Sequence, residues 1–453
     1  MSKNKRSTFS GKLGFVLSAA GASVGLGNIW RFPYLAAKYG GGIFLLVYII
    51  LALTFGYTMI MAETSLGRMT KKSPVGAYQS FGKSKWLSLG GWINAIIPIL
   101  IVPYYSVIGG WVIKYLIGYF SGQAQTLASD TYFSAFISNG ASTEICFIVF
   151  TFCTLGIIYA GVQNGIERVS KFMMPVLVVL SVIIAIYSVT RPGALEGVKY
   201  FLVPNPANFS WMTVVSAMGQ MFYSLSIAMG ILVTFGSYML KDMSIEDSTQ
   251  NVEIFDTAIA IMAGLMIIPA VFAFSGGDPD TLNAGPALMF ITIPKVFANM
   301  GLGTGILFFL LVLFAAMTSS IALTESAVST FEDELYWGRK KSTIVMAVIM
   351  VSLGSLSCLG YGPLANVTII GMQFLDFFDF LTNSVMMPIA AIATCLLVSR
   401  VIGVKKIEEE VTLEGKPFRR KKIFYFMIQY LCPIFAAIIL ISSVANAFGW
   451  ISM

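Results

Sequence analysis

Eleven apolar runs, each about as long as a membrane-crossing helix, determine what this chain can fold into. The hydrocarbon core of a bilayer requires roughly 20 apolar residues of helix, and only helices or closed barrels satisfy their backbone polar groups there. Charged residues make up 11% of the chain, against about 25% in soluble domains. The sequence therefore predicts an all-α polytopic membrane protein with eleven transmembrane helices, at residues 12–37, 42–67, 88–120, 144–161, 166–190, 211–240, 254–274, 304–330, 342–360, 372–399 and 423–449.

The basic residues indicate how the chain is oriented in the membrane. Most of the 29 Lys and Arg lie at the N-terminus and in alternate loops between the runs. Because cytoplasmic loops carry such an excess, we expect a cytoplasmic N-terminus, and an odd number of spans then places the C-terminus on the extracellular or periplasmic side. We interpret the charged segment 404–422 as a solvated loop rather than a binding patch, and we expect no nucleic-acid partner.

The first run is interrupted in a way that a simple anchor would avoid. From Gly21 to Pro33 it contains three glycines, Asn28 and Arg31. Glycine weakens a helix by about 1 kcal/mol relative to alanine, and an arginine at bilayer depth costs about 2.5 kcal/mol or more. An unwound helix whose free amides and carbonyls bind a ligand accounts for all of these residues. The alternative, a helix-packing face formed by Gly21 and Gly25, leaves Asn28 and Arg31 unexplained.

The sixth run has the same character and divides the chain into two halves. Hydroxyl-bearing residues and a glycine interrupt its apolar pattern over 220–230. A matched pair of interrupted segments in corresponding halves points to a midplane binding site in transporters with inverted repeats. We therefore expect a single transporter domain, residues 1–453, built as a 5+5 inverted repeat with helices 1 and 6 unwound. The first repeat would occupy about 12–190, the second about 211–399, and an extra helix about 423–449.

Polar residues inside other runs also call for an explanation. We expect Glu63 to accept hydrogen bonds from unwound backbone amides rather than to contact a substrate. Tyr105 is either an amphipathic core residue or part of a site. Asp256 either lies exposed at the membrane interface or faces the helix bundle, where its carboxylate would suit an alkali cation. The hydroxyls at 318–320 either bond back to their own helix or ligate a cation.

Two segments are expected near the outer face. Residues 275–303 are rich in Gly and Pro and partly apolar, and long ordered loops are usually functional, so we predict an external lid with a short re-entrant helix. Asp376 and Asp379 begin the tenth run, where Arg31 could reach one of them. The alternative for both carboxylates is a solvated helix N-terminus.

No motif in the chain supports an enzyme. Gly25-x-Gly27 lacks the preceding strand and the third glycine of a nucleotide-binding loop. The five cysteines have no metal-ligand spacing, and the chain has no histidine. The sequence also has no Gly-x-x-x-x-Gly-Lys-[Ser/Thr] loop and no soluble ATPase domain, so either an ion gradient supplies the energy for transport or the protein is passive.

The segment from Gly21 to Pro33 resembles the first-helix signature of the neurotransmitter:sodium symporter family. Further resemblances follow in order along nearly the whole chain, at Glu63-x-x-x-Gly67-Arg68, Tyr104-Tyr105, Gln220-x-Phe222-Tyr223-Ser224-Leu225-Ser226, Thr318-Ser319-Ser320 and Glu332-Asp333-Glu334. With eleven predicted spans rather than twelve, the chain resembles a bacterial branch of the family, which has a LeuT-like fold. The resemblance implies an amino-acid symporter of the bacterial cytoplasmic membrane that works by alternating access, and it leaves the oligomeric state open.

The resemblance also implies a substrate site. The substrate carboxylate would meet the amides of Leu26 and Gly27 and the hydroxyl of Tyr105, and the amino group would meet carbonyls near Ala22 and Tyr223. The implied substrate-binding residues are Ala22, Ser23, Gly25, Leu26, Gly27, Ile101, Tyr105, Tyr223, Ser224, Ser226, Met229, Ser319 and Leu323.

Two sodium ions and two gates are implied in the same way. The first Na⁺ would be held by the substrate and by Ser23, Asn28, Ser224 and Asp256. The second would be held by Gly21, Val24, Ala315, Thr318 and Ser319. The outer gate would pair Arg31 with Asp379 beneath Tyr223 and Gln220, and the inner gate would pair Arg6 with Asp333 near Phe9 and Tyr238.

Departures within the resemblance inform the substrate. Gly25 stands where monoamine carriers of the family have an aspartate, so an amino acid with its own carboxylate is favoured over an amine. Asp256 and Ala260 replace an asparagine and a chloride-binding serine, which implies chloride independence. Met229 lines an apolar pocket, which suits a hydrophobic neutral amino acid. The alternative function is a non-transporting amino-acid sensor, or a channel, on the same fold.

Overall fold

The computed structural model describes residues 6–276 and 286–450, and within these ranges it is helical throughout, with no strand. Nine helices in these ranges are long and apolar enough to cross a membrane, and the bent pair at the N-terminus makes ten if it is one span. The nine are Gly42–Thr70 (α3 and α4), Lys85–Phe120 (α6), Gly140–Tyr159 (α9), Val162–Val189 (ending in α10), Ile245–Ser275 (α14), Leu302–Glu334 (α16), Arg339–Leu359 (α17), Phe374–Ile402 (α18 and α19) and Lys421–Ala447 (α21 and α22). The all-helical prediction is therefore confirmed.

The first predicted span is broken where the sequence indicates. Helix α1 (Lys12–Ser23) ends at Val24, whose φ of −76° and ψ of 91° are extended. The chain resumes as a helical turn at Gly27–Arg31 and as α2 (Phe32–Lys38), bent by 54° from α1. The amides of Gly25 and Leu26 therefore donate to side-chain oxygens, of Asn28 and Tyr105 at 3.3 Å each, instead of to a helix, deep inside the protein.

The sixth predicted span is broken as well. Helix α12 (Trp211–Ser224) and helix α13 (Ile231–Tyr238) are separated by six residues. In that turn Ser226 and Ala228 have positive φ values of 53° and 59°, which cost a non-glycine residue about 1–2 kcal/mol each. Neither half is long enough to span alone, so the total of eleven spans and the division into two repeats stay predictions.

Two buried hydrogen bonds hold this turn. The amide of Ala228 donates to Oε1 of Glu63 at 2.8 Å, and the hydroxyl of Ser226 donates to the carbonyl of Ala22 at 2.9 Å. Glu63 lies on α4 (Tyr57–Thr70) and is fully buried. The structure thus places Glu63 against an unwound amide, as the sequence predicts, and joins the two helix breaks to each other.

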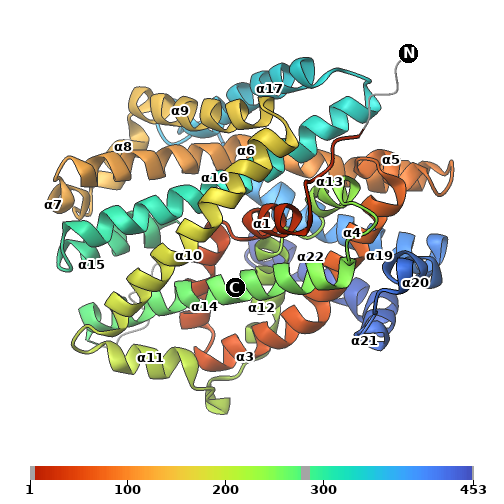
Figure 1. Cartoon of the computed structure of the whole chain (residues 1–453). Coiled ribbons are helices and arrows are strands. Elements are labelled where there is room, and N and C mark those ends of the chain that lie inside the picture. Colours follow the sequence, from red (N-terminus) through yellow and green to blue (C-terminus); the bar gives the residue numbers. More distant parts are fainter. Residues whose placement is uncertain (1–5, 277–285, 451–453) are drawn as a thin grey trace.

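The broken helices lie in the middle of the bundle (Figure 1). Helix α1 packs against α10, α14 and α16, and α13 packs against α4. The two longest helices, α6 and α16, pack along each other beside the break in α1. Several short helices connect the spans: α5 (Pro74–Gln79), α7 (Ala124–Leu127), α8 (Tyr132–Ser138), α11 (Ala194–Leu202), α15 (Ile293–Ala298) and α20 (Val404–Val411).

Two connecting segments bear on the sequence predictions. The expected lid, 275–303, contains an apolar helix at Leu288–Ala298, and the hydroxyl of Tyr115 donates to the carbonyl of Phe290 at 2.7 Å. Residues 277–285 of that segment lie outside the described residues. The segment 404–422 differs from the solvated loop that we expected, because α20 docks on the bundle. There Glu410 accepts from Nε of the fully buried Arg68 at 2.6 Å.

Candidate substrate and ion site

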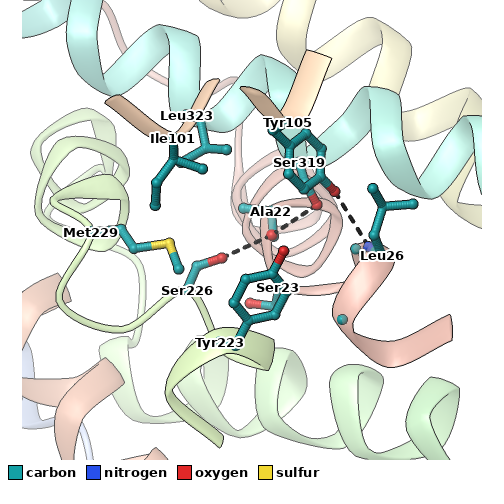
Figure 2. A pocket seen from close by; sticks show the side chains of 12 residues that line it. Ala22, Ser23, Leu26, Ile101, Tyr105, Tyr223, Ser226, Met229, Ser319 and Leu323 are labelled. Carbon is teal, nitrogen blue, oxygen red and sulfur yellow. Dashed lines mark hydrogen bonds between the residues drawn. The ribbon is translucent and has the colours of Figure 1, made fainter. Parts of the chain in front are cut away.

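A small cavity lies at the break in α1, enclosed by α1, α6, α16 and the turn between α12 and α13 (Figure 2). Its volume of about 20 Å³ is room for about one water molecule. Twelve residues line it: Ala22, Ser23, Gly25, Leu26, Gly27, Ile101, Tyr105, Tyr223, Ser226, Met229, Ser319 and Leu323. All twelve belong to the predicted substrate-binding set. Ser224, the thirteenth member, points away toward Asp256.

The polar end of the cavity is formed by backbone groups and hydroxyls. The amide of Leu26 donates to the hydroxyl of Tyr105 at 3.3 Å, and the hydroxyl of Ser319 donates to the carbonyl of Ala22 at 3.2 Å. Because the amides of Leu26 and Gly27 lie at the start of a helical segment, they carry partial positive charge and suit an anionic group. This end of the cavity can therefore receive a carboxylate.

Close packing at the polar end requires two glycines. A Cβ atom on Gly25 would lie 2.6 Å from Oγ of Ser319 and 3.1 Å from the hydroxyl of Tyr105. A Cβ atom on Gly27 would lie 2.2 Å from the ring of Tyr223. The space beside Gly25 is therefore too small for any side chain, including an aspartate, in the arrangement that the structure describes.

The opposite end of the cavity is apolar. Ile101, Met229 and Leu323 come from three different segments and point toward one another (Figure 2). All three are at most 5% exposed. Met229 is unbranched and can rearrange around ligands of different shape. This end offers dispersion contacts and no charged partner to a ligand side chain.

A second feature is a buried carboxylate next to the cavity. Asp256, on α14, is fully buried and accepts from Nδ2 of Asn28 at 2.8 Å, from the hydroxyl of Ser224 at 2.8 Å and from the hydroxyl of Tyr48 at 3.0 Å. No cation forms an ion pair with it in the described part of the chain. Of the two locations left open for Asp256, the structure shows the one that faces the bundle.

This cluster differs from the implied ion ligands in two respects. The hydroxyl of Ser23 donates to the carbonyl of Ala19 in its own helix at 3.2 Å rather than to the Asp256 group. Tyr48, on α3 (Gly42–Leu51), was not singled out in the sequence, because one tyrosine in a long apolar run cannot be distinguished from a packing residue. Its ring packs edge-on against Phe32 at 4.9 Å. Buried uncompensated carboxylates are costly, so the group is suited to hold a cation.

Carbonyl oxygens gather on the other side of the α1 break. The hydroxyl of Ser319 lies 3.4 Å from the carbonyl oxygen of Gly21 and 3.5 Å from that of Val24. The hydroxyl of Thr318 donates to the carbonyl of Ala315 at 3.1 Å, and a Cβ atom on Gly21 would meet the Thr318 side chain at 3.2 Å. All five residues implied for the second Na⁺ therefore lie together, and oxygen atoms of this kind are the ligands of hard cations.

One of the two predicted gate pairs is bonded. Nη1 of Arg6 lies 2.6 Å from Oδ1 of Asp333, and Arg6 also donates to the hydroxyls of Ser237 and Ser329. Its guanidinium stacks over the ring of Tyr238 at 4.9 Å. We call this group of five residues the N-terminal gate. Beside this group, the amide of Phe9 donates to the carbonyl of Tyr238 at 3.1 Å.

The other predicted pair is not bonded. Arg31 lies over the ring of Tyr223 at 5.4 Å, and Asp379 accepts instead from Nδ2 of Asn383 at 2.5 Å and from the hydroxyl of Tyr104 at 3.2 Å. No ion pair joins Arg31 to Asp379 within the described ranges. Gln220 donates to the carbonyl of Gly27 at 3.0 Å, which places it over the break in the first span.

The chain is similar to known proteins over nearly its whole length. A profile described as the sodium:neurotransmitter symporter family matches residues 6–139 and 119–449. An uncharacterized sodium-dependent transporter of Bacillus subtilis, YhdH, is 35% identical over 455 residues and covers 98% of both chains. An uncharacterized sodium-dependent transporter of Haemophilus influenzae is 31% identical over 456 residues, covering 97% of this chain and 98% of its own. Among solved structures, MhsT in complex with L-phenylalanine superimposes with a TM-score of 0.87 at 35% identity, covering 97% of this chain and all of MhsT.

Proposed function

The chain belongs to the sodium:neurotransmitter symporter family, and from that premise we propose that it carries neutral, hydrophobic amino acids into the cell together with Na⁺. It is a membrane-spanning secondary transporter and not an enzyme. The observation that carries the proposal is the cavity at the α1 break, with backbone amides and Tyr105 at one end and Ile101, Met229 and Leu323 at the other. A zwitterionic head group with an apolar side chain matches the polarity of both ends, and the cavity of about 20 Å³ would have to widen to admit it.

The substrate class follows from the two ends of the cavity. A carboxylate at Leu26 and Gly27 would occupy the start of a helical segment, where negative charge is favoured. An apolar side chain among Ile101, Met229 and Leu323 would leave no polar group unpaired, whereas a charged side chain would be buried without a partner. The phenylalanine bound to the related MhsT supports this choice.

We propose two Na⁺ ions, one at each oxygen cluster. The first would join the substrate carboxylate to the group around Asp256, Asn28 and Ser224, and the second would lie among the carbonyls of Gly21 and Val24 with Ser319. Since the substrate completes the first ion's shell, each ligand raises the affinity of the other by the same factor. That reciprocity would couple uptake to the sodium gradient.

We also propose that transport does not require chloride. Asp256 supplies a fixed negative charge beside the first ion, and Ala260, one turn along α14, is fully buried and has no hydroxyl to hold an anion. Uptake should be unchanged when chloride is replaced by gluconate. Loss of uptake under that replacement would remove this part of the proposal.

The N-terminal gate, which we place on the cytoplasmic side of a bacterial inner membrane, would open only after the ligands are bound. Arg6 and Asp333 form an ion pair, whereas Arg31 and Asp379 do not. A carrier with one gate pair formed and the other apart is closed at one end only, and this supports alternating access. A channel would need both ends open together, and a sensor would need no release path.

The deciding experiment is flux into proteoliposomes that contain the purified full chain. Radiolabelled leucine and phenylalanine should accumulate against their gradients when Na⁺ is higher outside, and accumulation should stop when Na⁺ is equal or replaced by K⁺. A channel would equilibrate the amino acid without accumulation. A sensor would bind in the presence of Na⁺ with no flux. A competition panel of the twenty amino acids would then rank aliphatic against aromatic substrates.

A further inference from the structure

One buried carboxylate close to the N-terminal segment belongs neither to the N-terminal gate nor to the two oxygen clusters. Glu167 ends a π-helical segment, Val162–Glu167, that leads into α10 (Arg168–Val189), and its side chain is only 3% exposed. A glutamate is almost never buried to this extent unless its oxygens are bound. The partner of Glu167 is the chain just before α1, 157 residues away in the sequence.

Two hydrogen bonds tie that part of the chain to Glu167. The amide of Ser10 donates to Oε2 at 2.9 Å, and the hydroxyl of Ser10 donates to Oε1. From the same π-helical segment, Nε2 of Gln163 donates to the carbonyl of Thr8 at 2.8 Å. Lys171, one turn further along, donates to Oε1 of Glu167 at 2.6 Å and offsets its charge. We call the contact between Ser10 and Glu167 the clasp. It fastens the N-terminal segment to α10, whereas the N-terminal gate fastens the same segment to α16.

The start of α1 lacks the residues that usually stabilise a helix end. Its N-cap residue is Gly11, which has no side chain to bind the free amides, and its first turn contains no acidic residue. Those amides carry partial positive charge, which a nearby carboxylate stabilises. A Cβ atom on Gly14, in this first turn, would lie 2.3 Å from Oε1 of Glu167. Glu167 therefore supplies the missing negative charge to α1 from a neighbouring helix.

Gly14 provides the space that the carboxylate occupies. The three atoms nearest to a Cβ at this position, at 2.3, 2.4 and 2.9 Å, all belong to the side chain of Glu167. Contacts this short cannot persist, so any side chain at position 14 would push the carboxylate away from the helix end. Glycine weakens a helix, and Gly14 lies within the regular helix Lys12–Ser23 rather than in a turn. Close approach of Glu167 accounts for a glycine here.

The surroundings of the clasp allow it to break. A cavity of about 300 Å³ that is open to solvent borders it, and its lining residues are Ser10, Gln163, Glu167, Arg168 and Lys171. Voids in an apolar interior are costly, but Ser10 can leave Glu167 on this side without creating one. Water can then bind the carboxylate and the freed amide. The clasp is therefore built as a contact that can form and separate.

We propose that Glu167 is a positioning residue of the N-terminal gate, whose carboxylate holds Ser10 and the first turn of α1 against α10 while the gate is closed and releases both when it opens. The inference rests on the proposed alternating-access function. The bonds from Ser10 and the approach to Gly14 cross from one helix to another, and they form only while the start of α1 lies against α10. Together they stabilise the closed gate, independently of the ion pair between Arg6 and Asp333.

The test measures gate opening directly, in the absence of substrate. Spin labels are placed at Ser7→Cys on the N-terminal segment and at Lys340→Cys on α17, both exposed, with Cys153→Ser removing the exposed native thiol. Distance distributions are recorded for the full chain in nanodiscs. Glu167→Gln keeps the size of the side chain and removes its charge, and we expect the ratio of open to closed populations to rise about tenfold. Glu196→Gln is the matched control, because it removes an exposed carboxylate from the first turn of α11, and it should give the wild-type distribution.

A double-mutant cycle separates the clasp from a general loss of packing. Gly14→Ala leaves the carboxylate in the chain but displaces it, so this variant alone should also raise the open population. In a Glu167→Ala background there is no carboxylate to displace, and the double variant should be no more open than Glu167→Ala by itself. Thermal melting checks that every variant is folded. Additive effects of the two substitutions, or a Glu167→Gln gate as closed as wild type, would overturn the proposal.

Flux measurements keep this inference distinct from the proposed function. If proteoliposomes showed no amino-acid flux but the labels followed the expected pattern, the transport proposal would fail and the clasp would stand. Na⁺-driven uptake in a protein whose label distances are indifferent to Glu167 and Gly14 would have the opposite meaning.

Discussion

Replacing Gly25 with alanine tests the geometry of the polar end of the cavity. The added Cβ would lie 2.6 Å from Oγ of Ser319 and 3.1 Å from the hydroxyl of Tyr105. Contacts below 3.0 Å do not survive, so something must move. Ser319 lies on α16 and is 6% exposed, which leaves rotation of its hydroxyl away from the Ala22 carbonyl as the available response. The substitution therefore disturbs the substrate site and the carbonyl cluster together.

The magnitude follows from overpacking. One extra methyl group in a well-packed interior costs about 1–3 kcal/mol, and here the cost is concentrated where the ligand carboxylate would lie. At about 1.4 kcal/mol per factor of ten, we expect the amino-acid dissociation constant of Gly25→Ala to rise roughly 5- to 150-fold. The Na⁺ concentration for half-maximal binding should rise in the same variant, because Ser319 faces both clusters.

The assay is equilibrium binding of radiolabelled leucine and phenylalanine to purified protein over a range of Na⁺ concentrations. Gly156→Ala, on α9, is the matched control, because a Cβ atom at that position would meet no heavy atom within 4 Å. This variant should bind the amino acids with wild-type affinity. Wild-type affinity in Gly25→Ala, with both variants equally folded by thermal melting, would refute the reasoning about this end of the cavity.

Three further predictions follow from the ion clusters and the gate. Asp256→Ala should abolish Na⁺-driven uptake, because it removes the acceptor shared by Asn28 and Ser224; normal uptake in proteoliposomes would contradict the assignment. Ser319→Ala should raise the half-saturating Na⁺ concentration about tenfold, because the ion loses one oxygen ligand. The control Ser320→Ala should leave that concentration unchanged, because the hydroxyl of Ser320 contacts Thr154 instead. Arg6→Ala should speed hydrogen exchange of the 231–238 segment, since Ser237 loses its charged partner; unchanged protection would show that this pair does not hold the gate.

The sequence alone was sufficient where the physical signal is local. Hydropathy shows the apolar runs, because lipid and a packed interior both require a continuous length of apolar helix. The glycines of the first span and the hydroxyls of the sixth predict both breaks, since each is a local departure from that pattern. The twelve residues that line the cavity were implied only by the family resemblance, since Ile101, Met229 and Leu323 lie in ordinary apolar sequence that no local signal distinguishes.

Only the tertiary structure decided which polar groups meet. Tyr48 and Asp256 are 208 residues apart and bond across the bundle, and nothing in either segment distinguishes that contact from an exposed carboxylate and a packing tyrosine. The sequence likewise did not predict that Arg31 contacts Tyr223 rather than Asp379. Nor did it predict that Glu410, in a segment expected to be a solvated loop, binds Arg68. Hydrophobic length determines where helices form, but the rotation and depth of each helix against its neighbours determine which side chains come within 3 Å of one another, and these depend on the packing of the whole bundle.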